Sequence, residues 1–135
     1  MGLNMILILG GIGQGKEDFA GKQFPELAGK TAVDGKTASW EEFLKAGYAV
    51  NVQEMIRRRL EEGKKAEELE RDMVGELTEA CPERVLITDE IGYGIVPIDA
   101  FLRDYRELTG RICCRLAKEA REVWRVTAGI GQRIK

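Results

Sequence analysis

Residues 10–16 directly follow an apolar run at residues 5–9 and constrain this chain more than any other feature. A short apolar run that ends in glycines is typical of a strand buried on both faces of a parallel sheet. The glycines and Lys16 fit the phosphate-loop pattern G-x-x-x-x-G-K-[ST] up to its last position, where Glu17 replaces the hydroxyl residue. The sequence therefore predicts a strand, a phosphate-binding loop and a helix, with a departure at the position that normally holds the metal.

The loop residues indicate how a nucleotide would bind. Backbone N–H groups of such a loop surround the phosphates, and the lysine ammonium reaches the terminal ones. The predicted nucleotide-binding residues are Gly10, Gly11, Gly13, Gln14, Gly15, Lys16 and Glu17. A dinucleotide-binding loop and a purely structural glycine turn remain alternatives. The acid expected about 20 residues beyond a dinucleotide loop is poorly placed, so the phosphate loop is favoured.

Strand and helix patterns alternate along the rest of the chain. The expected strands lie at residues 5–9, 31–34, 85–88, 123–127 and 132–134, and the expected helices begin near Gly15, fill residues 40–80 and follow a cap at Asp99. Alternation of this kind predicts a single α/β domain over residues 1–135. Its sheet should be mostly parallel and flanked by helices, with a short C-terminal antiparallel strand.

Acidic residues stand where the later strands end. Asp34 ends the second expected strand, and Asp89 and Glu90 end the third. Because ligands of parallel α/β sheets bind at the carboxyl ends of the strands, these residues should lie near the glycine loop. A carboxylate there can hold Mg²⁺, and Asp34 with Glu17 is the predicted pair of ligands. Alternatively, Asp34 is a turn residue in the pair Asp34-Gly35.

Composition and charge limit the partners of the chain. Its 135 residues are 44% hydrophobic and 33% charged, with a net charge of −2, so nothing attracts it generally to nucleic acid or an anionic membrane. Arg57-Arg58-Arg59 could suggest a nucleic-acid patch, but neighbouring glutamates favour a solvated helix face. No window reaches the roughly 18 apolar residues of a membrane span, and the N-terminal run is not a signal peptide. A cytoplasmic protein is the expectation.

Histidine and cysteine usage narrows the chemistry further. The chain has no histidine, which excludes histidine-based proton transfer and covalent catalysis within these residues. Cys81, Cys113 and Cys114 form no C-x-x-C pair, so we expect reduced, partly buried thiols.

A second motif, at residues 88–97, reads T-D-E-I-G-Y-G-I-V-P. It resembles the T-N-E-V-G-x-G-I-V-P signature of the bifunctional adenosylcobinamide kinase / adenosylcobinamide-phosphate guanylyltransferase family. The resemblance continues to residues 129–135, which are similar to the closing G-I-G-x-x-I-K of that family, and it includes the opening strand and loop. Tyr93, within this motif, would either stack on a base or corrinoid or cover the edge of the core.

The resemblance implies a cytoplasmic homo-oligomer with a three-layer, P-loop NTPase-like sheet that acts late in coenzyme B12 assembly. Enzymes of this family phosphorylate adenosylcobinamide with ATP or GTP and then transfer GMP from GTP to the phosphate through a guanylylated histidine. It implies ATP or GTP with Mg²⁺ and a corrinoid as ligands, and no bound prosthetic group. The residues it implies for catalysis are Lys16, Asp34 and Glu90.

Departures from the family pattern leave three hypotheses. Gln14 and Glu17 replace serines of the family loop, and Asp89 replaces an asparagine. The segment that carries the family histidine is missing, so guanylyl transfer by that route is not expected. The chain is either a reduced enzyme that keeps the kinase step, a non-catalytic protein that binds a nucleotide, a corrinoid or a partner, or a scaffold without ligands.

Overall fold

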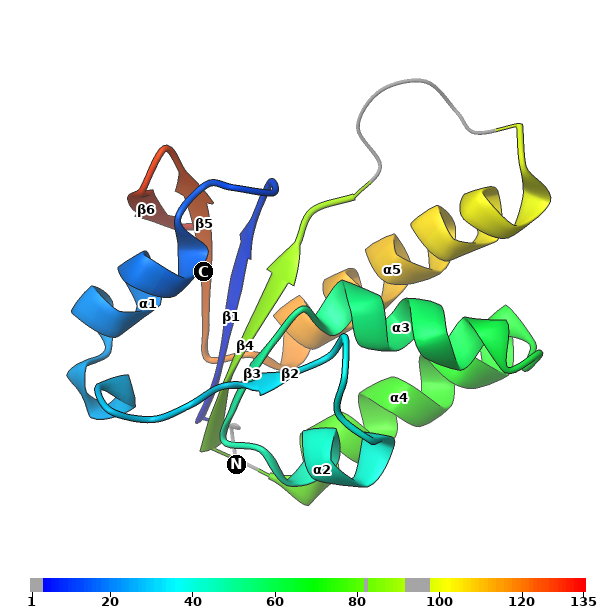
Figure 1. The fold of residues 1–135 in the computed structure, drawn as a ribbon, viewed down its shortest axis with the longest axis horizontal. Helices are drawn as coiled ribbons and strands as arrows, with labels where there is room; N and C mark the ends of the chain where they lie inside the picture. Colours follow the sequence, from blue (N-terminus) through cyan, green and yellow to red (C-terminus); the bar gives the residue numbers. More distant parts are fainter. Residues whose placement is uncertain (1–3, 82, 92–97) are drawn as a thin grey trace.

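The computed structural model describes residues 4–81, 83–91 and 98–135, and its strands form one six-stranded sheet with helices on both faces (Figure 1). The strands are β1 (Asn4–Gly10), β2 (Val33–Asp34), β3 (Tyr48–Val50), β4 (Glu83–Asp89), β5 (Glu122–Thr127) and β6 (Ile130–Arg133). The helices are α1 (Lys16–Gln23), the short 3₁₀ helix η1 (Pro25–Leu27), α2 (Trp40–Lys45), α3 (Val52–Glu61), α4 (Ala66–Ala80) and α5 (Ala100–Glu119). The predicted α/β class is confirmed. Residues 92–97, including Tyr93, lie outside the described residues.

Strand order explains why the first apolar run is buried so completely. The order is β2-β3-β4-β1-β5-β6, so β1 lies between β4 and β5 and pairs with both in parallel. Leu7 and Ile8, which point to opposite faces of the sheet, are both fully buried. A strand covered on both faces needs apolar residues at successive positions, as the sequence indicated.

The predicted antiparallel C-terminal strand is also confirmed, as β6 paired with β5. Ala128 and Gly129 form the two-residue turn between these strands, with φ of 51° and 76°. Positive φ at both positions is the signature of a type I′ hairpin turn, which favours glycine. The strand begins at Ile130, earlier than the predicted residue 132, because the turn needs only these two residues.

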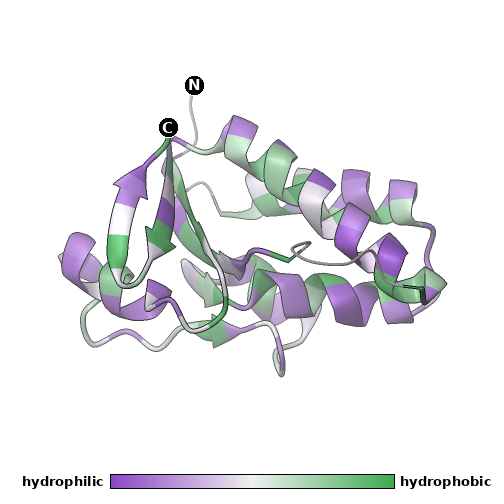
Figure 2. Ribbon diagram, turned by 90° about the horizontal axis from the view of Figure 1, so that it is seen from above, coloured by the Kyte–Doolittle hydropathy of each residue, from purple (hydrophilic) through white to green (hydrophobic). Residues whose placement is uncertain are grey.

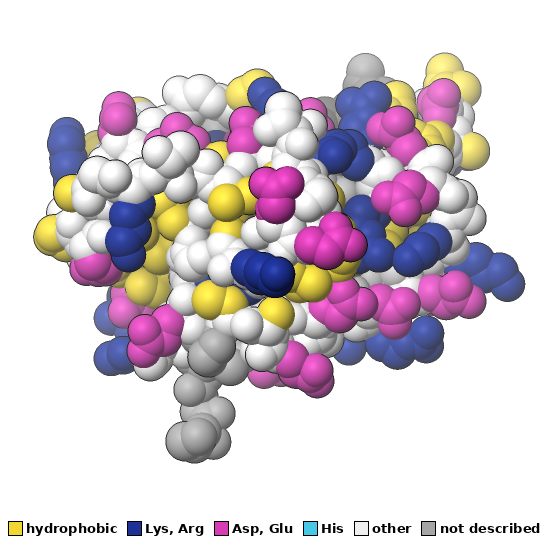
Figure 3. All heavy atoms as spheres, turned by 60° about the horizontal axis from the view of Figure 1, so that its bottom comes forward, with side chains coloured by type: hydrophobic (Ala, Val, Ile, Leu, Met, Phe, Trp, Pro, Cys, Tyr) yellow, Lys and Arg dark blue, Asp and Glu magenta, His cyan; other side chains and the backbone are white. Residues whose placement is uncertain are grey.

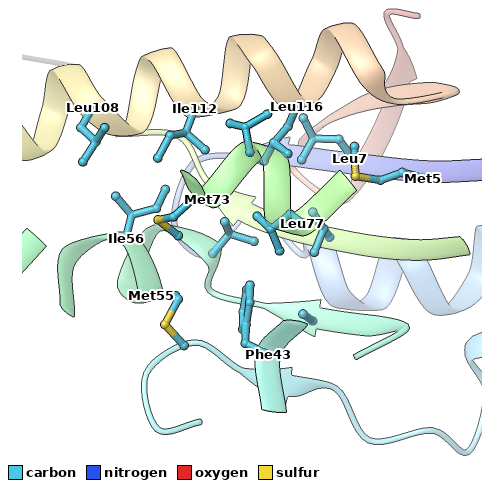
Figure 4. Packing of buried hydrophobic residues seen from close by; sticks show 14 of the residues in the cluster. Met5, Leu7, Phe43, Met55, Ile56, Met73, Leu77, Leu108, Ile112 and Leu116 are labelled. Atoms are coloured by element: carbon cyan, nitrogen blue, oxygen red, sulfur yellow. The ribbon is translucent and has the colours of Figure 1, made fainter. Parts of the chain in front are cut away.

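The larger core lies between the sheet and helices α2 to α5. Figure 4 shows Leu108 and Ile112 of α5 pointing toward Ile56 of α3 and Met73 of α4, with Leu116 farther along α5 beside Leu7 of β1. The apolar periodicity of residues 52–77 correctly predicted one shared core face, although Gly63, at φ 91°, divides α3 from α4. Hydrophilic and hydrophobic residues alternate along the helical ribbons, as expected for helices with one polar and one apolar face (Figure 2).

A smaller core fills the opposite face, beneath α1 and η1. Ala20, Phe24 and Leu27 pack there against Ile8 and other residues of the sheet. Trp124 of β5 closes this core with its ring 5.3 Å from that of Phe19. The fold therefore has three layers, and the loop between β1 and α1 crosses from the sheet to the thinner outer layer (Figure 1).

Strand β3 is an element that the sequence reading missed, because only helices were expected within residues 40–80. Tyr48–Val50 instead pair in parallel with both β2 and β4, and Ala49 and Val50 are buried. Three residues are too few for a periodic pattern to distinguish a buried strand from a helix turn. Asn51, the residue after β3, therefore lies at the carboxyl edge of the sheet, beside the end of β4.

The three consecutive arginines of α3 do not form a solvated face, which corrects the prediction for two of them. Arg57 pairs with Glu61 at 3.3 Å, as expected. Arg58 instead donates to the carbonyl oxygens of Gly35 and Ala38, and Arg59 is buried with its guanidinium 4.3 Å from the Trp40 ring. Arg58 and Arg59 therefore connect α3 to the segment from Gly35 to Trp40. On the face shown in Figure 3, basic and acidic side chains are interspersed.

Among the described residues, no helix is long and apolar enough to cross a membrane. The cysteines Cys81, Cys113 and Cys114 are free thiols.

Gly35 is the position where the fold should tolerate a side chain least. A Cβ there would lie 2.1 Å from the carbonyl oxygen of Asn51, and backbone cannot move aside as a side chain can. We expect Gly35→Ala to lower the free energy of unfolding by about 2 kcal/mol or more. Urea denaturation followed by circular dichroism measures it.

Gly21→Ala is the matched control, since nothing lies within 4 Å of a Cβ at this α1 position. Alanine should stabilise α1 there by about 0.5–1 kcal/mol. Equal effects of the two substitutions would show that the close approach of Gly35 to Asn51 is wrong.

Candidate functional site

The loop between β1 and α1 has the backbone geometry that binds anions. Gly13 and Gly15 adopt φ of 73° and 82°, a conformation that glycine reaches without strain. Gly15 is the N-cap of α1 and makes no side-chain cap, so the first backbone N–H groups of the helix have no partner from a capping side chain. Such groups, together with the helix dipole, favour a phosphate at this position.

Lys16 folds back across the loop. Its ammonium donates to the carbonyl oxygen of Gly11 at 2.8 Å, and its side chain is only 7% exposed. Gly10 leaves room for the Lys16 side chain, because a Cβ at residue 10 would lie 3.2 Å from it. The same Cβ would clash with the carbonyl oxygen of Val126 at 2.5 Å. The ammonium of Lys16 is therefore held within the loop, beside its backbone.

A cleft of about 320 Å³ opens beside the loop. It is lined by residues 12–18 together with Lys36, Val50, Asn51, Ile87 and Asp89. Charges of both signs therefore line it: the carboxylates of Glu17, Asp18 and Asp89 and the ammonium groups of Lys16 and Lys36. Glu17 and Asp18 are exposed in the first turn of α1.

Asp89 is the acid closest to the loop lysine. In the register of β1 and β4, Gly10 lies directly beside Asp89, and this pairing brings the end of β4 to the start of the loop. One carboxylate oxygen of Asp89 lies 2.6 Å from the Lys16 ammonium. A short contact between partly buried opposite charges is stronger than a surface pair.

Gln53 of α3 holds the other side of Asp89. Its amide nitrogen donates to the second carboxylate oxygen of Asp89 at 3.2 Å, and its amide oxygen accepts from the Asp89 backbone N–H at 3.0 Å. Gln53 is 5% exposed, and its backbone oxygen accepts from the Tyr105 hydroxyl at 2.9 Å. Burial raises the pKa of Tyr105, so this hydroxyl stays protonated and keeps donating.

Asn51 extends the network to Asp34. It adopts a left-handed conformation at φ 56°, which asparagine tolerates better than most residues, and α3 begins directly after it. Its amide nitrogen donates to Asp34 at 2.8 Å, and its side-chain oxygen accepts from Gln53 at 3.3 Å. One chain of polar contacts thus joins Asp34, Asn51, Gln53, Asp89 and Lys16 across the carboxyl ends of β2, β3, β4 and β1.

Gln14 ties the loop to the β5–β6 hairpin. Its side-chain oxygen accepts from the Ala128 N–H at 2.6 Å, and its backbone oxygen accepts from the Gly129 N–H at 2.8 Å. A Cβ on Gly15 would come within 3.4 Å of Gly129, so the two turns lie against each other. The hairpin therefore supports the loop from the side opposite Asp89.

Comparison with known proteins identifies the family. A sequence model described as cobinamide kinase / cobinamide phosphate guanyltransferase matches residues 48–134. The chain belongs to this family. The match begins at β3 and includes Asn51, Gln53 and Asp89, whereas the glycine loop precedes it.

Two curated relatives support the assignment. The bifunctional adenosylcobalamin biosynthesis protein CobU of Salmonella typhimurium is 50% identical over 56 residues, and its counterpart from Escherichia coli K12 is 48% identical over 56 residues. Each alignment covers 41% of this chain and 31% of the relative. The chain therefore aligns with about a third of the length of these CobU proteins.

The predicted site residues of this family member divide into two groups. The loop residues from Gly10 to Glu17 and the end of β4 meet, as the rule for parallel sheets predicted. Asp34 and Glu90 are not among the described residues that line the cleft. Glu90 forms an ion pair with Arg125, with both contacts at 3.0 Å. Its catalytic role remains a prediction.

Asp34 has the geometry of a turn residue, which was the alternative prediction. Its carboxylate accepts from the Lys36 N–H at 2.9 Å, and its backbone oxygen accepts from Thr37 and Ala38. Partial burial raises the pKa of Asp34, but hydrogen bonds from Lys36 and Asn51 and the Lys36 charge outweigh it, so the pKa is lowered overall. Among the described residues, no cluster of three acids, cysteines or histidines could hold a metal.

Asn51 and Gln53 are site residues that sequence reasoning missed, and Asp89 was given no role of its own. A signal existed for Asn51, since asparagine between a short apolar run and a helix is a candidate for a left-handed residue. Gln53 carried no signal, because its contacts with Asp89 depend on how α3 crosses the end of β4.

Asp34 gives a pH-dependent test of this network. Its pKa is lower in the folded chain than the ordinary value of 3.8, so its stabilising effect is full above that value and is lost as the pH falls through the folded-state pKa. We expect Asp34→Asn to be less stable than the unsubstituted chain at pH 7, with the difference shrinking below about pH 4. Urea denaturation at several pH values measures this.

Glu26→Gln, on the exposed surface of η1, removes one negative charge away from the network and serves as control. The same pH dependence for both substitutions would contradict a specific role of the Asp34 hydrogen bonds.

Proposed function

We propose that this chain binds the triphosphate of ATP or GTP at residues 10–16 and catalyses the kinase step of its family on a cobinamide. The hydroxyl oxygen of the corrinoid side chain would attack the γ-phosphorus, the bond to the bridging β–γ oxygen would break, and the hydroxyl proton would pass to water. The nucleoside diphosphate would leave.

The observation that carries this proposal is the placement of Lys16. Its ammonium lies within a loop of left-handed glycines at the N-terminus of α1 and faces a cleft of about 320 Å³. Transfer of a phosphoryl group depends mainly on positioning and on neutralising the phosphate charge. Lys16 and the loop N–H groups supply both functions, and Gln14 fixes the loop against the hairpin.

The residues of the cleft fit a magnesium ion that arrives with the nucleotide. Mg²⁺ prefers oxygen ligands and is commonly held by one or two carboxylates together with phosphate oxygens. Glu17 and Asp89 line the cleft and offer such carboxylates, whereas Asp34, which the sequence predicted to pair with Glu17, is not part of the described lining. When bound, the metal would neutralise charge on the phosphates.

The second step of the family is not proposed for these residues. Guanylyl transfer in this family is expected to use a histidine, and the chain contains none. A protein that binds nucleotide or corrinoid without catalysis is the second candidate, and the three carboxylates that face the cleft favour it, because they oppose an anionic ligand.

Activity assays separate the two candidates. Adenosylcobinamide is incubated with γ-labelled ATP or GTP and Mg²⁺, and the labelled corrinoid phosphate is measured by chromatography. Nucleotide binding with no labelled product would favour the non-catalytic protein.

Size-exclusion chromatography with light scattering tests the homo-oligomer that the family resemblance implies.

Lys16 should be essential for nucleotide binding. Lys16→Met keeps the apolar length of the side chain but removes its charge, so we expect binding of ATP and GTP to weaken by about 10²-fold or more. Isothermal titration calorimetry measures it. Lys22→Met removes the same charge from the exposed last turn of α1 and should change the affinity by less than about twofold. Equal losses would show that the loop is not the site.

Glu17 should oppose nucleotide binding. Its carboxylate lines the cleft beside the loop, and Glu17→Ser restores the hydroxyl of the phosphate-loop pattern. We expect affinity for ATP without metal to rise about fivefold, since water and salt screen this exposed charge. Glu26→Ser on η1 is the control. An unchanged affinity would exclude Glu17 as the obstacle, and weaker binding only with Mg²⁺ would identify it as a metal ligand.

A further inference from the structure

Asp89 contacts the ammonium of Lys16 in the cleft beside the loop. The ammonium has two close acceptors, the carbonyl oxygen of Gly11 at 2.8 Å and the carboxylate of Asp89 at 2.6 Å. Both Lys16 and Asp89 line the cleft beside the loop. A phosphate that enters the cleft must therefore compete with Asp89 for the lysine or share it.

The carboxylate of Asp89 cannot easily turn away. The amide nitrogen of Gln53 donates to one carboxylate oxygen of Asp89, and its amide oxygen accepts from the backbone N–H of Asp89. Two hydrogen bonds therefore hold Asp89 in this position. Gln53 is itself buried and is joined to Asn51 and Tyr105. Asp89 therefore stays in the cleft when a ligand arrives, and its charge must be balanced there.

The charges that line the cleft show what would balance it. The cleft is lined by two ammonium groups, of Lys16 and Lys36, and by three carboxylates, of Glu17, Asp18 and Asp89, so the described lining has a net negative charge before any ligand binds. A metal-free triphosphate would draw Lys16 to itself and leave Asp89 facing phosphate oxygens. A triphosphate that carries a divalent cation would bring the positive charge that Asp89 then lacks.

We propose that Asp89 determines specificity, by making the site select metal-bound over metal-free polyphosphate. The inference rests on the proposed nucleotide site and adds a residue and a selectivity to it. The Lys16–Asp89 ion pair and the two hydrogen bonds between Gln53 and Asp89 support this role, in which Asp89 transfers no proton.

Asp89→Asn tests this selectivity. The substitution keeps the size of the side chain and one oxygen acceptor but removes the charge. Affinities for inorganic tripolyphosphate and for ATP are measured by calorimetry on the full chain, with EDTA and with saturating Mg²⁺. We expect metal-free binding to strengthen about tenfold while binding with Mg²⁺ changes by about threefold at most. The ratio of the affinity with Mg²⁺ to the affinity with EDTA therefore falls.

Asp18→Asn is the matched control, since Asp18 lines the same cleft and Lys16 pairs with Asp89 instead. It should shift the ratio by about threefold or less, as one exposed charge does. Equal shifts for the two variants would overturn the proposal, because general electrostatics would then suffice. Weaker binding of Asp89→Asn in both conditions would also overturn it, because Asp89 would then only hold Lys16 in place.

Two further outcomes separate this inference from the proposed function. Binding by the unsubstituted chain with an unchanged ratio in Asp89→Asn overturns the inference alone. Failure of every variant to bind either probe, with or without Mg²⁺, overturns the proposed nucleotide site and the inference with it. If Asp89→Asn does not fold by circular dichroism, Asp89→Ser must lower the ratio in the same way, and a ratio that stays constant rejects the proposal.

Discussion

The in-register pairing of β1 with β4 is the constraint on which the site depends. It sets Gly10 beside Asp89, so the loop after one strand and the acid that ends the next share one edge of the sheet. Because the pairing is parallel and both strands are buried, a slip of one residue would turn Leu7 or Leu86 toward the wrong layer. Core packing thus fixes the distance between Lys16 and Asp89.

The helices carry this constraint outward to the polar residues. α3 begins at Val52, directly after the left-handed Asn51, and its buried residues Met55 and Ile56 pack into the larger core. That packing fixes how α3 crosses the sheet and where Gln53 meets Asp89. A substitution in the core beneath α3 should therefore shift Gln53 and, through its hydrogen bonds, the position of Asp89 in the cleft.

Much of this arrangement could be predicted from the sequence where its signals are local. The apolar run before the glycines predicted β1, and Asp99, whose carboxylate accepts from the Leu102 N–H, predicted the start of α5. The loop and Lys16 follow from a pattern with a known backbone geometry. Such features depend on neighbours in the chain, which is why a single sequence contains them.

The missed features depend on residues far apart in the chain. β3 has three residues and is defined by its pairing with β2 and β4. Arg58 and Arg59 looked solvent-exposed among glutamates, yet their partners are the carbonyls after β2 and the Trp40 ring. Helix periodicity cannot show a hydrogen bond to a carbonyl 20 residues away.

Glu17, the departure that the sequence makes most visible, is only one part of the charge balance of the cleft. It is exposed, so solvent screens its effect on a phosphate. Asp89 has a side chain only 19% exposed and touches Lys16 directly, so its charge acts at shorter range and with less screening. Because Lys16 already has a close partner in Asp89, we expect the response of the proposed nucleotide site to depend on Asp89 more than on Glu17.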